Sequence, residues 1–171
     1  MGILICGLNG VGKSTIGKLL AKRMSYKFID NEELYFPKND KWYEFSNPRS
    51  KKEVIHILEE RIKDNNEFIF AAVKGDYGEK LISLLDYVIL VEVPKETRIE
   101  RVKMRSFQKF GNRIFMDEDL AKKEEAWFSL VSSRREDFVT NWLENINCQV
   151  ICIDGTLPVD ENVEYLLSVL K

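Results

Sequence analysis

Eight residues near the start of the chain have the types and spacing of a phosphate-binding loop. They fit the pattern G-x-x-x-x-G-K-[ST] at Gly7, Gly12, Lys13 and Ser14. Glycines permit positive φ angles and let backbone N–H groups approach phosphate oxygens, and a helix N-terminus adds further free donors. The lysine ammonium can reach the β- and γ-phosphates, and the serine hydroxyl can bind Mg²⁺. The pattern therefore predicts a site for ATP and Mg²⁺. The residues expected to contact the nucleotide here are Leu8, Asn9, Gly10, Val11, Gly12, Lys13, Ser14 and Thr15.

An acidic turn, Asp30-Asn31-Glu32, follows a second apolar segment. Ligands collect at the carboxyl ends of the strands in open α/β sheets, so Asp30 is placed to act. Its carboxylate could hold Mg²⁺ or accept a proton from an acceptor hydroxyl. Two alternatives remain open: Asp30 could merely cap the next helix, and Asp76 could be the base instead.

Basic residues concentrate between Lys95 and Arg113. Arg98, Arg101 and Arg105 recur at helical spacing, so they are expected on one helical face. A solvated charged face is the ordinary explanation of such a pattern. Arg134 and Arg135 form a second candidate pair, of which only one can face a given site because neighbours lie about 100° apart on a helix.

Aromatic residues gather between the second and third apolar segments, in a stretch of about residues 34–50. They could form an acceptor pocket by stacking, or simply a small core of their own. The residues are Tyr35, Phe36, Trp42, Tyr43 and Phe45, with Arg49 nearby. Lys74, after the third apolar segment, could bind an anionic acceptor group.

The elements that must position these residues alternate along the chain. Nearly continuous apolar runs predict buried strands, and runs with a period near 3.6 predict amphipathic helices. Such alternation indicates a parallel sheet covered on both faces, in three α/β/α layers. The expected strands are 2–6, 26–29, 68–73, 87–93 and 148–153. One expected helix starts at residue 13, and the others span 51–63, 79–85, 95–106, 118–145 and 159–170.

Length and composition narrow the class of protein. The 171 residues suit a single domain, and 26 basic against 28 acidic side chains give no case for nucleic acid as a partner. No apolar run reaches the roughly 18 residues of a membrane helix. Three cysteines make no disulfide framework, so a cytoplasmic location is expected. The oligomeric state has no sequence signature here.

The order of motifs resembles the nucleoside monophosphate kinase and shikimate kinase-like group of P-loop kinases. An AAA-type P-loop NTPase assignment is compatible with it. The matching residues are the loop at 7–14, the turn at 30–32, the segment 86–90 with Pro94, the arginine helix and Ile153-Asp154-Gly155-Thr156. The resemblance implies a P-loop NTPase fold with a five-stranded parallel sheet in the order 2-3-1-4-5. It also implies a lid, about residues 106–118, and an acceptor-side insertion, about 34–50.

Further roles follow from this resemblance. Arg105 and Arg113 would face the phosphates when the lid closes, and Lys13 and Asp30 would join them as catalytic residues. Ser14 and Asp30 would hold the metal. Gly155 and Thr156 would wrap the adenine base, although backbone contacts there do not separate ATP from GTP.

The function expected from these features is transfer of the γ-phosphoryl group of ATP to a nucleotide or a small hydroxylated metabolite. Neither the acidic turn nor the turn Lys74-Gly75-Asp76 has a residue pattern that identifies the acceptor. The alternative is an ATP-hydrolysing switch or nucleotide-sensing module without a small-molecule acceptor. A phosphotransferase that acts on a macromolecule or an antibiotic is a third possibility.

Overall fold

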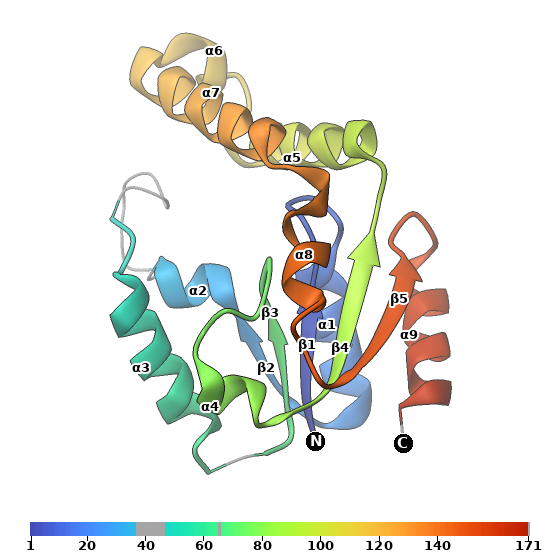
Figure 1. Ribbon diagram of the computed structural model, residues 1–171. Helices are drawn as coiled ribbons and strands as arrows, with labels where there is room; N and C mark the ends of the chain where they lie inside the picture. Colours follow the sequence, from blue (N-terminus) through green and yellow to red (C-terminus); the bar gives the residue numbers. More distant parts are fainter. Residues whose placement is uncertain (37–46, 65, 171) are drawn as a thin grey trace.

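Five strands form one parallel sheet in the order β2-β3-β1-β4-β5, as predicted (Figure 1). The computed structural model describes residues 1–36, 47–64 and 66–170 of the chain. The strands are β1 (Gly2–Cys6), β2 (Lys27–Asp30), β3 (Phe68–Ala71), β4 (Leu85–Glu92) and β5 (Gln149–Asp154). Every residue of β1 and β3 is buried, which explains why these two sequences are apolar throughout.

Helices cover both faces of the sheet. On one face, α1 (Lys13–Met24) and α9 (Val159–Val169) pack against each other. The other face carries α4 (Glu79–Ile82) and α8 (Thr140–Leu143) (Figure 1). At the outer side, α3 (Lys51–Ile62) follows the short α2 (Asn31–Tyr35). A capping box between Ser50 and Glu53 fixes where α3 begins.

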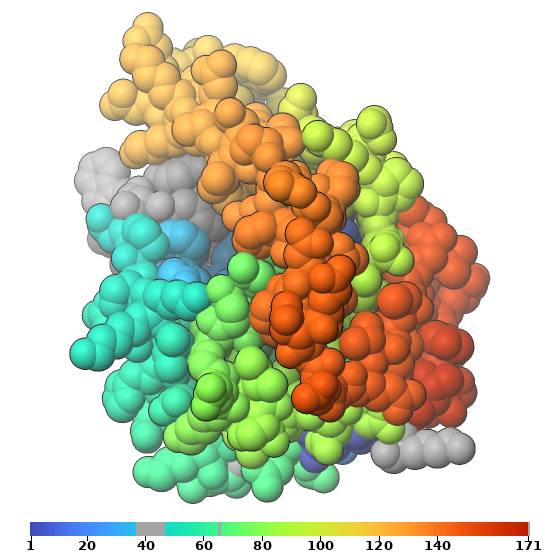
Figure 2. Space-filling model, in the orientation of Figure 1, coloured from blue at the N-terminus to red at the C-terminus, as the bar shows by residue number. Residues whose placement is uncertain are grey.

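Three helices project beyond the carboxyl ends of the strands and form what we call the arm (Figures 1 and 2). They are α5 (Lys95–Phe110), α6 (Arg113–Met116) and α7 (Glu118–Ser133). The helix predicted to end at Ser106 continues to Phe110, because no helix-breaking residue occurs before Gly111, which adopts a φ of 57°. A buried hydrogen bond from Ser106 to Glu124 joins α5 to α7.

The prediction of one continuous helix from Glu118 to Asn145 is wrong. It is interrupted after Ser133, where Arg134 and Arg135 are extended, and resumes as the 3-10 turn η1 (Glu136–Phe138) and α8. The hydroxyls of Ser132 and Ser133 bond back to the carbonyls of Phe128 and Leu130, at 2.7 and 3.1 Å. Such bonds compete with helix continuation. Helical spacing of apolar residues alone could not reveal the interruption.

Part of the aromatic stretch falls outside the described residues, namely Trp42, Tyr43 and Phe45. Tyr35 and Phe36 end α2, and Arg49 donates to the Leu34 carbonyl at 2.8 Å. None of the helices in the described ranges is long and apolar enough to span a membrane.

Candidate nucleotide and acceptor site

The loop between β1 and α1 has the backbone geometry that phosphate binding requires. Gly10 and Gly12 have φ angles of 87° and 99°, in the region that favours glycine. A Cβ on Gly10 would lie 2.4 Å from the backbone oxygen of Arg98, so this position admits no side chain. Gly12 has no neighbour within 4 Å of its would-be Cβ, which leaves open space beside the helix N-terminus.

Lys13 folds back over this loop. Its Nζ donates to the Leu8 carbonyl at 2.9 Å. Burial lowers the pKa of Lys13 to about 8, and the nearby guanidinium groups of Arg105 and Arg134 act in the same direction. The ammonium is therefore held in a place where an added anion would be strongly favourable.

A single cleft of about 710 Å³ connects the loop with the acidic turn. One part is lined by residues 9–16 and by Gly155 and Thr156, and another by Asp30, Asn31 and Glu32, with Asp30 close to Ser14. Tyr35 and Phe36 from α2 and Trp127 from α7 complete the wall. The cleft therefore brings together the residues predicted from both halves of the sequence.

Four cationic side chains line the same cleft: Lys13, Arg101, Arg105 and Arg134. Arg101 donates to the Gly155 carbonyl at 3.0 Å, and Arg134 donates to Asn9 Oδ1 at 2.5 Å. In the described part of the chain, none of the four forms an ion pair with a carboxylate. Cations gathered in this way without direct ion pairs form a complementary surface for a polyanion such as a triphosphate.

Asp30 is 8% exposed at the end of β2. Its Oδ1 accepts the backbone N–H of Glu32 at 3.0 Å, so the predicted capping role is real. The carboxylate nevertheless also lines the cleft with Ser14. Among described residues no three acidic, histidine or cysteine side chains form a ready metal cluster. A hydroxyl, a carboxylate and phosphate oxygens are nevertheless a donor set that suits Mg²⁺.

Asn31 is held in place from the loop that joins β3 to α4. Tyr77, which is 6% exposed, donates its hydroxyl hydrogen to Asn31 Oδ1 at 2.6 Å. The ring of Tyr77 also meets Phe70 edge-on, with ring centroids 5.2 Å apart. The part of the cleft beside the acidic turn is thus fixed by buried packing.

Several predicted residues lie elsewhere. Arg113 is on α6 with its side chain 73% exposed, 3.8 Å from Asp117, and does not line the cleft. Asp76 pairs with Lys51 at 2.9 Å and with Lys74 at 3.6 Å, also outside it.

Leu8 was predicted to contact the nucleotide, and one of Arg134 and Arg135 to face the site. The side chain of Leu8 is buried and does not line the cleft, and its carbonyl accepts a hydrogen bond from Lys13. Of the second arginine pair, Arg134 faces the cleft, whereas Arg135 pairs with Asp137 at the surface.

Two positions beside the candidate site have no signal in the sequence. Trp127 lies in the cleft wall. Arg98 was placed on an exposed charged face, yet it is 1% exposed. The helical spacing of Arg98 with Arg101 and Arg105 gave no sign of this burial.

Comparison with protein families identifies the group to which the chain belongs. The family model described as "AAA domain" matches residues 3–126, which include the loop, the acidic turn and most of the arm. The chain belongs to this AAA-domain family. A relative of this AAA-domain protein, "Uncharacterized protein YqaC" of Bacillus subtilis (strain 168), is 28% identical over 99% of this chain and 97% of its own length.

Solved structures share the fold of this AAA-domain protein. A gluconokinase from Sinorhizobium meliloti 1021 matches with a TM-score of 0.57 and 19% identity, over 98% of this chain and 89% of that one. A shikimate kinase from Aquifex aeolicus matches with a TM-score of 0.52 and 18% identity, over 99% and 96%. At these identities the similarity establishes a P-loop kinase-like fold.

Proposed function

We propose that the chain is an ATP-dependent kinase that transfers the γ-phosphoryl group to a hydroxyl of a small acceptor. The observation that carries the proposal is the shared cleft. It brings together a phosphate-binding loop, cations that form no ion pair among the described residues, and a nearly buried carboxylate, Asp30. A binding module needs only the loop and the cations, whereas transfer to a hydroxyl also needs a base. The kinase-like fold is consistent with this.

The residues have separate roles in the proposed reaction. The Asp30 carboxylate accepts the proton of the acceptor hydroxyl, whose oxygen attacks the γ-phosphorus as the bond to the β–γ bridging oxygen breaks. Lys13 and Arg134 neutralise the charge that spreads over the transferred group. Ser14 and Asp30 would hold Mg²⁺, which when bound supplies charge neutralisation at the phosphates. Gly155 and Thr156 would contact the base of ATP.

The arm would act as the lid. Arg105 already lines the cleft from α5, whereas exposed Arg113 on α6 would contribute only after the arm closes over bound substrates. Closure would also exclude water, which separates transfer to an acceptor from hydrolysis.

The test is ADP release from ATP and Mg²⁺ with a panel of nucleoside monophosphates, shikimate, gluconate and other small hydroxy acids. We expect at least one acceptor to stimulate release. Release that no acceptor changes would contradict the kinase proposal and favour the ATP-hydrolysing switch. Lys13→Ala should abolish nucleotide binding under either function, so it does not separate them.

Asp30→Asn tests the chemistry. It should retain ATP binding and lower acceptor-dependent kcat by about 10²–10⁴-fold, the usual contribution of a general base. Asp76→Asn is the matched control, since it removes the same charge from outside the cleft and should leave turnover intact. The reverse pattern would assign the base to Asp76.

A further inference from the structure

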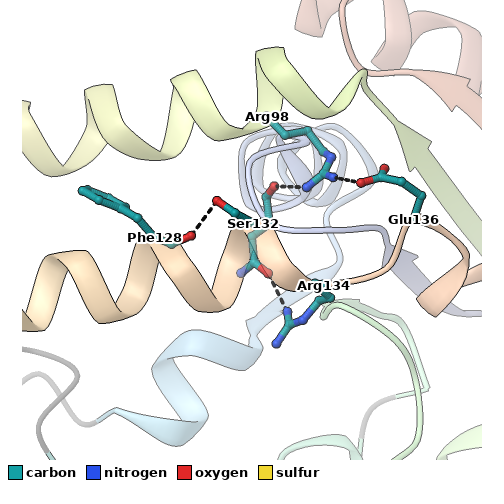
Figure 3. Close-up of polar contacts among 6 residues, drawn as sticks. Arg98, Phe128, Ser132, Arg134 and Glu136 are labelled. Atoms are coloured by element: carbon teal, nitrogen blue, oxygen red, sulfur yellow. Dashed lines mark hydrogen bonds and ion pairs between the residues drawn. The ribbon is translucent and has the colours of Figure 1, made fainter.

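Arg98 is a buried cation that the proposed reaction does not use. It lies in the first turn of α5 and is 1% exposed (Figure 3). One terminal nitrogen, Nη1, donates to the Asn9 carbonyl at 3.3 Å, and the other, Nη2, donates to Glu136 Oε1 at 2.7 Å. Among the described residues, the Nε atom has no hydrogen-bond partner. An apolar side chain of similar volume often fills such a space with no loss of folding stability, so stability alone does not explain an arginine here.

The contacts of Arg98 converge on the phosphate-binding loop. Its guanidinium reaches the carbonyl of Asn9, and its own backbone oxygen closes against Gly10, where a Cβ would approach to 2.4 Å. Both the side chain and the backbone of one residue therefore fix the loop at two successive positions. Both positions line the cleft and are among the residues expected to contact the nucleotide.

Asn9 is also contacted by Arg134, which follows the C-terminus of α7. Arg134 Nη1 donates to Asn9 Oδ1 at 2.5 Å, two residues before Glu136 (Figure 3). The segment 134–136 thus makes two contacts with this region, from Arg134 to the side chain of Asn9 and from Glu136 to Arg98. The ring of Phe138 lies 5.4 Å from the Arg134 guanidinium carbon and supports it from another side.

We propose that Arg98 and Glu136 are positioning residues that orient Arg134 toward the γ-phosphate of bound nucleotide. Arg98 anchors Glu136, and Glu136 fixes the short segment from which Arg134 extends. Displacement of a contact by about 1 Å can cost as much as a hundredfold in rate, so an anchor that touches no substrate can still govern the site. The proposal rests on the nucleotide site of the proposed function, but not on the identity of any acceptor.

The test compares two nucleotides that differ at the γ-phosphate. Calorimetry would measure the affinity of the wild type and of the double variant Arg98→Met/Glu136→Gln for Mg·ADP and for a non-hydrolysable ATP analogue. Removing both charges together avoids leaving a buried cation unpaired. We expect ADP affinity within about twofold of the wild type and affinity for the analogue about tenfold weaker, the cost of one charge-assisted contact. Thermal denaturation should give a Tm near that of the wild type.

Matched variants make the result decisive. Glu136→Gln alone changes a half-exposed residue and keeps a side-chain oxygen that can still accept from Arg98 Nη2, so Arg98 is not left without a partner. This variant should fold even if the double variant does not, and should show a smaller loss with the same selectivity. Arg134→Gln should lose at least as much affinity for the analogue. Arg135→Gln, beside it but 78% exposed and paired with Asp137, should change neither affinity.

Four outcomes would overturn the inference. Equal weakening of both nucleotides would make Arg98 and Glu136 a support for the loop fold only. Unchanged affinities in the double variant and in Glu136→Gln would show that these two residues do not position Arg134. An unchanged preference for the ATP analogue over ADP in Arg134→Gln would show that Arg134 does not contact the γ-phosphate. A wild type that binds neither nucleotide would refute this inference and the proposed function together. Binding as expected without acceptor-stimulated ADP release would refute the kinase proposal alone.

Discussion

Raising the pH from 7 to 9 should weaken ATP binding about tenfold, because it removes the proton from Lys13 in the empty site. Burial lowers the pKa of this ammonium from 10.5 to about 8. A triphosphate stabilises the protonated form, so binding at high pH must first restore the proton. With a pKa near 8, roughly nine-tenths of Lys13 is protonated at pH 7 and about one-tenth at pH 9, which gives the tenfold factor.

The same shift has a consequence for folding with the opposite sign. Each pKa unit corresponds to about 1.4 kcal/mol, so the cation costs the empty protein about 3 kcal/mol below pH 8. Between pH 8 and 10.5 the unfolded chain holds the Lys13 proton more tightly than the folded chain does. The contribution of Lys13 to stability therefore improves as pH rises through this window, while nucleotide affinity falls.

Calorimetry checks the prediction directly. Titrations with ATP at pH 7, 8 and 9, in buffers of different ionisation enthalpy, give both Kd and the number of protons taken up. At pH 8.5 about three-quarters of a proton should be bound per nucleotide. Lys13→Arg is the control, since a guanidinium stays charged over this range and its affinity should not change with pH. A flat Kd with no proton uptake in the wild type would refute the reasoning.

The remaining predictions concern the loop and the acceptor end. Gly10→Ala should abolish nucleotide binding, because its Cβ would collide with the Arg98 backbone oxygen. The Cβ of Gly12→Ala would meet no atom, so this variant should lower the free energy of unfolding only by the roughly 1–2 kcal/mol that a left-handed alanine costs. Equal Tm losses measured by calorimetry for the two variants would contradict this. Tyr77→Phe removes the hydrogen bond to Asn31 and should lower stability by about 1 kcal/mol and raise KM for the acceptor while leaving that for ATP unchanged. A shift in the KM for ATP of the same size would instead mean that the two ends of the cleft are not separable.

The sheet could be predicted because its sequence signals are local. Continuous apolar runs identify buried parallel strands, whereas the order 2-3-1-4-5 is implied only by the resemblance to P-loop kinases. The break at Arg134 could not be predicted in this way. Val131 is buried and Trp142 packs against the core on either side of the break, so apolar spacing stays nearly helical across it.

The site was predictable only where backbone chemistry dictates residue type. Glycines with positive φ and a lysine at fixed spacing leave a clear pattern, whereas arginines do not reveal whether they face solvent. Arg98, Arg101 and Arg105 have the same type and share one helix, yet the first is buried under the loop and the other two line the cleft. Only tertiary contacts, with Glu136 and with Asn9, separate them.

The interrupted helix also gives the arm a mechanical property. Both of its ends, Arg98 at the start of α5 and Arg134 after α7, are tied to Asn9, so a rotation of the arm would have its fulcrum beside the phosphate-binding loop. The 16 residues of α7 form a lever about 24 Å long, and a turn of about 10° would carry its far end about 4 Å. Arg134, at the fulcrum, would hardly move. An unbroken rod would instead have swept that guanidinium along with the tip.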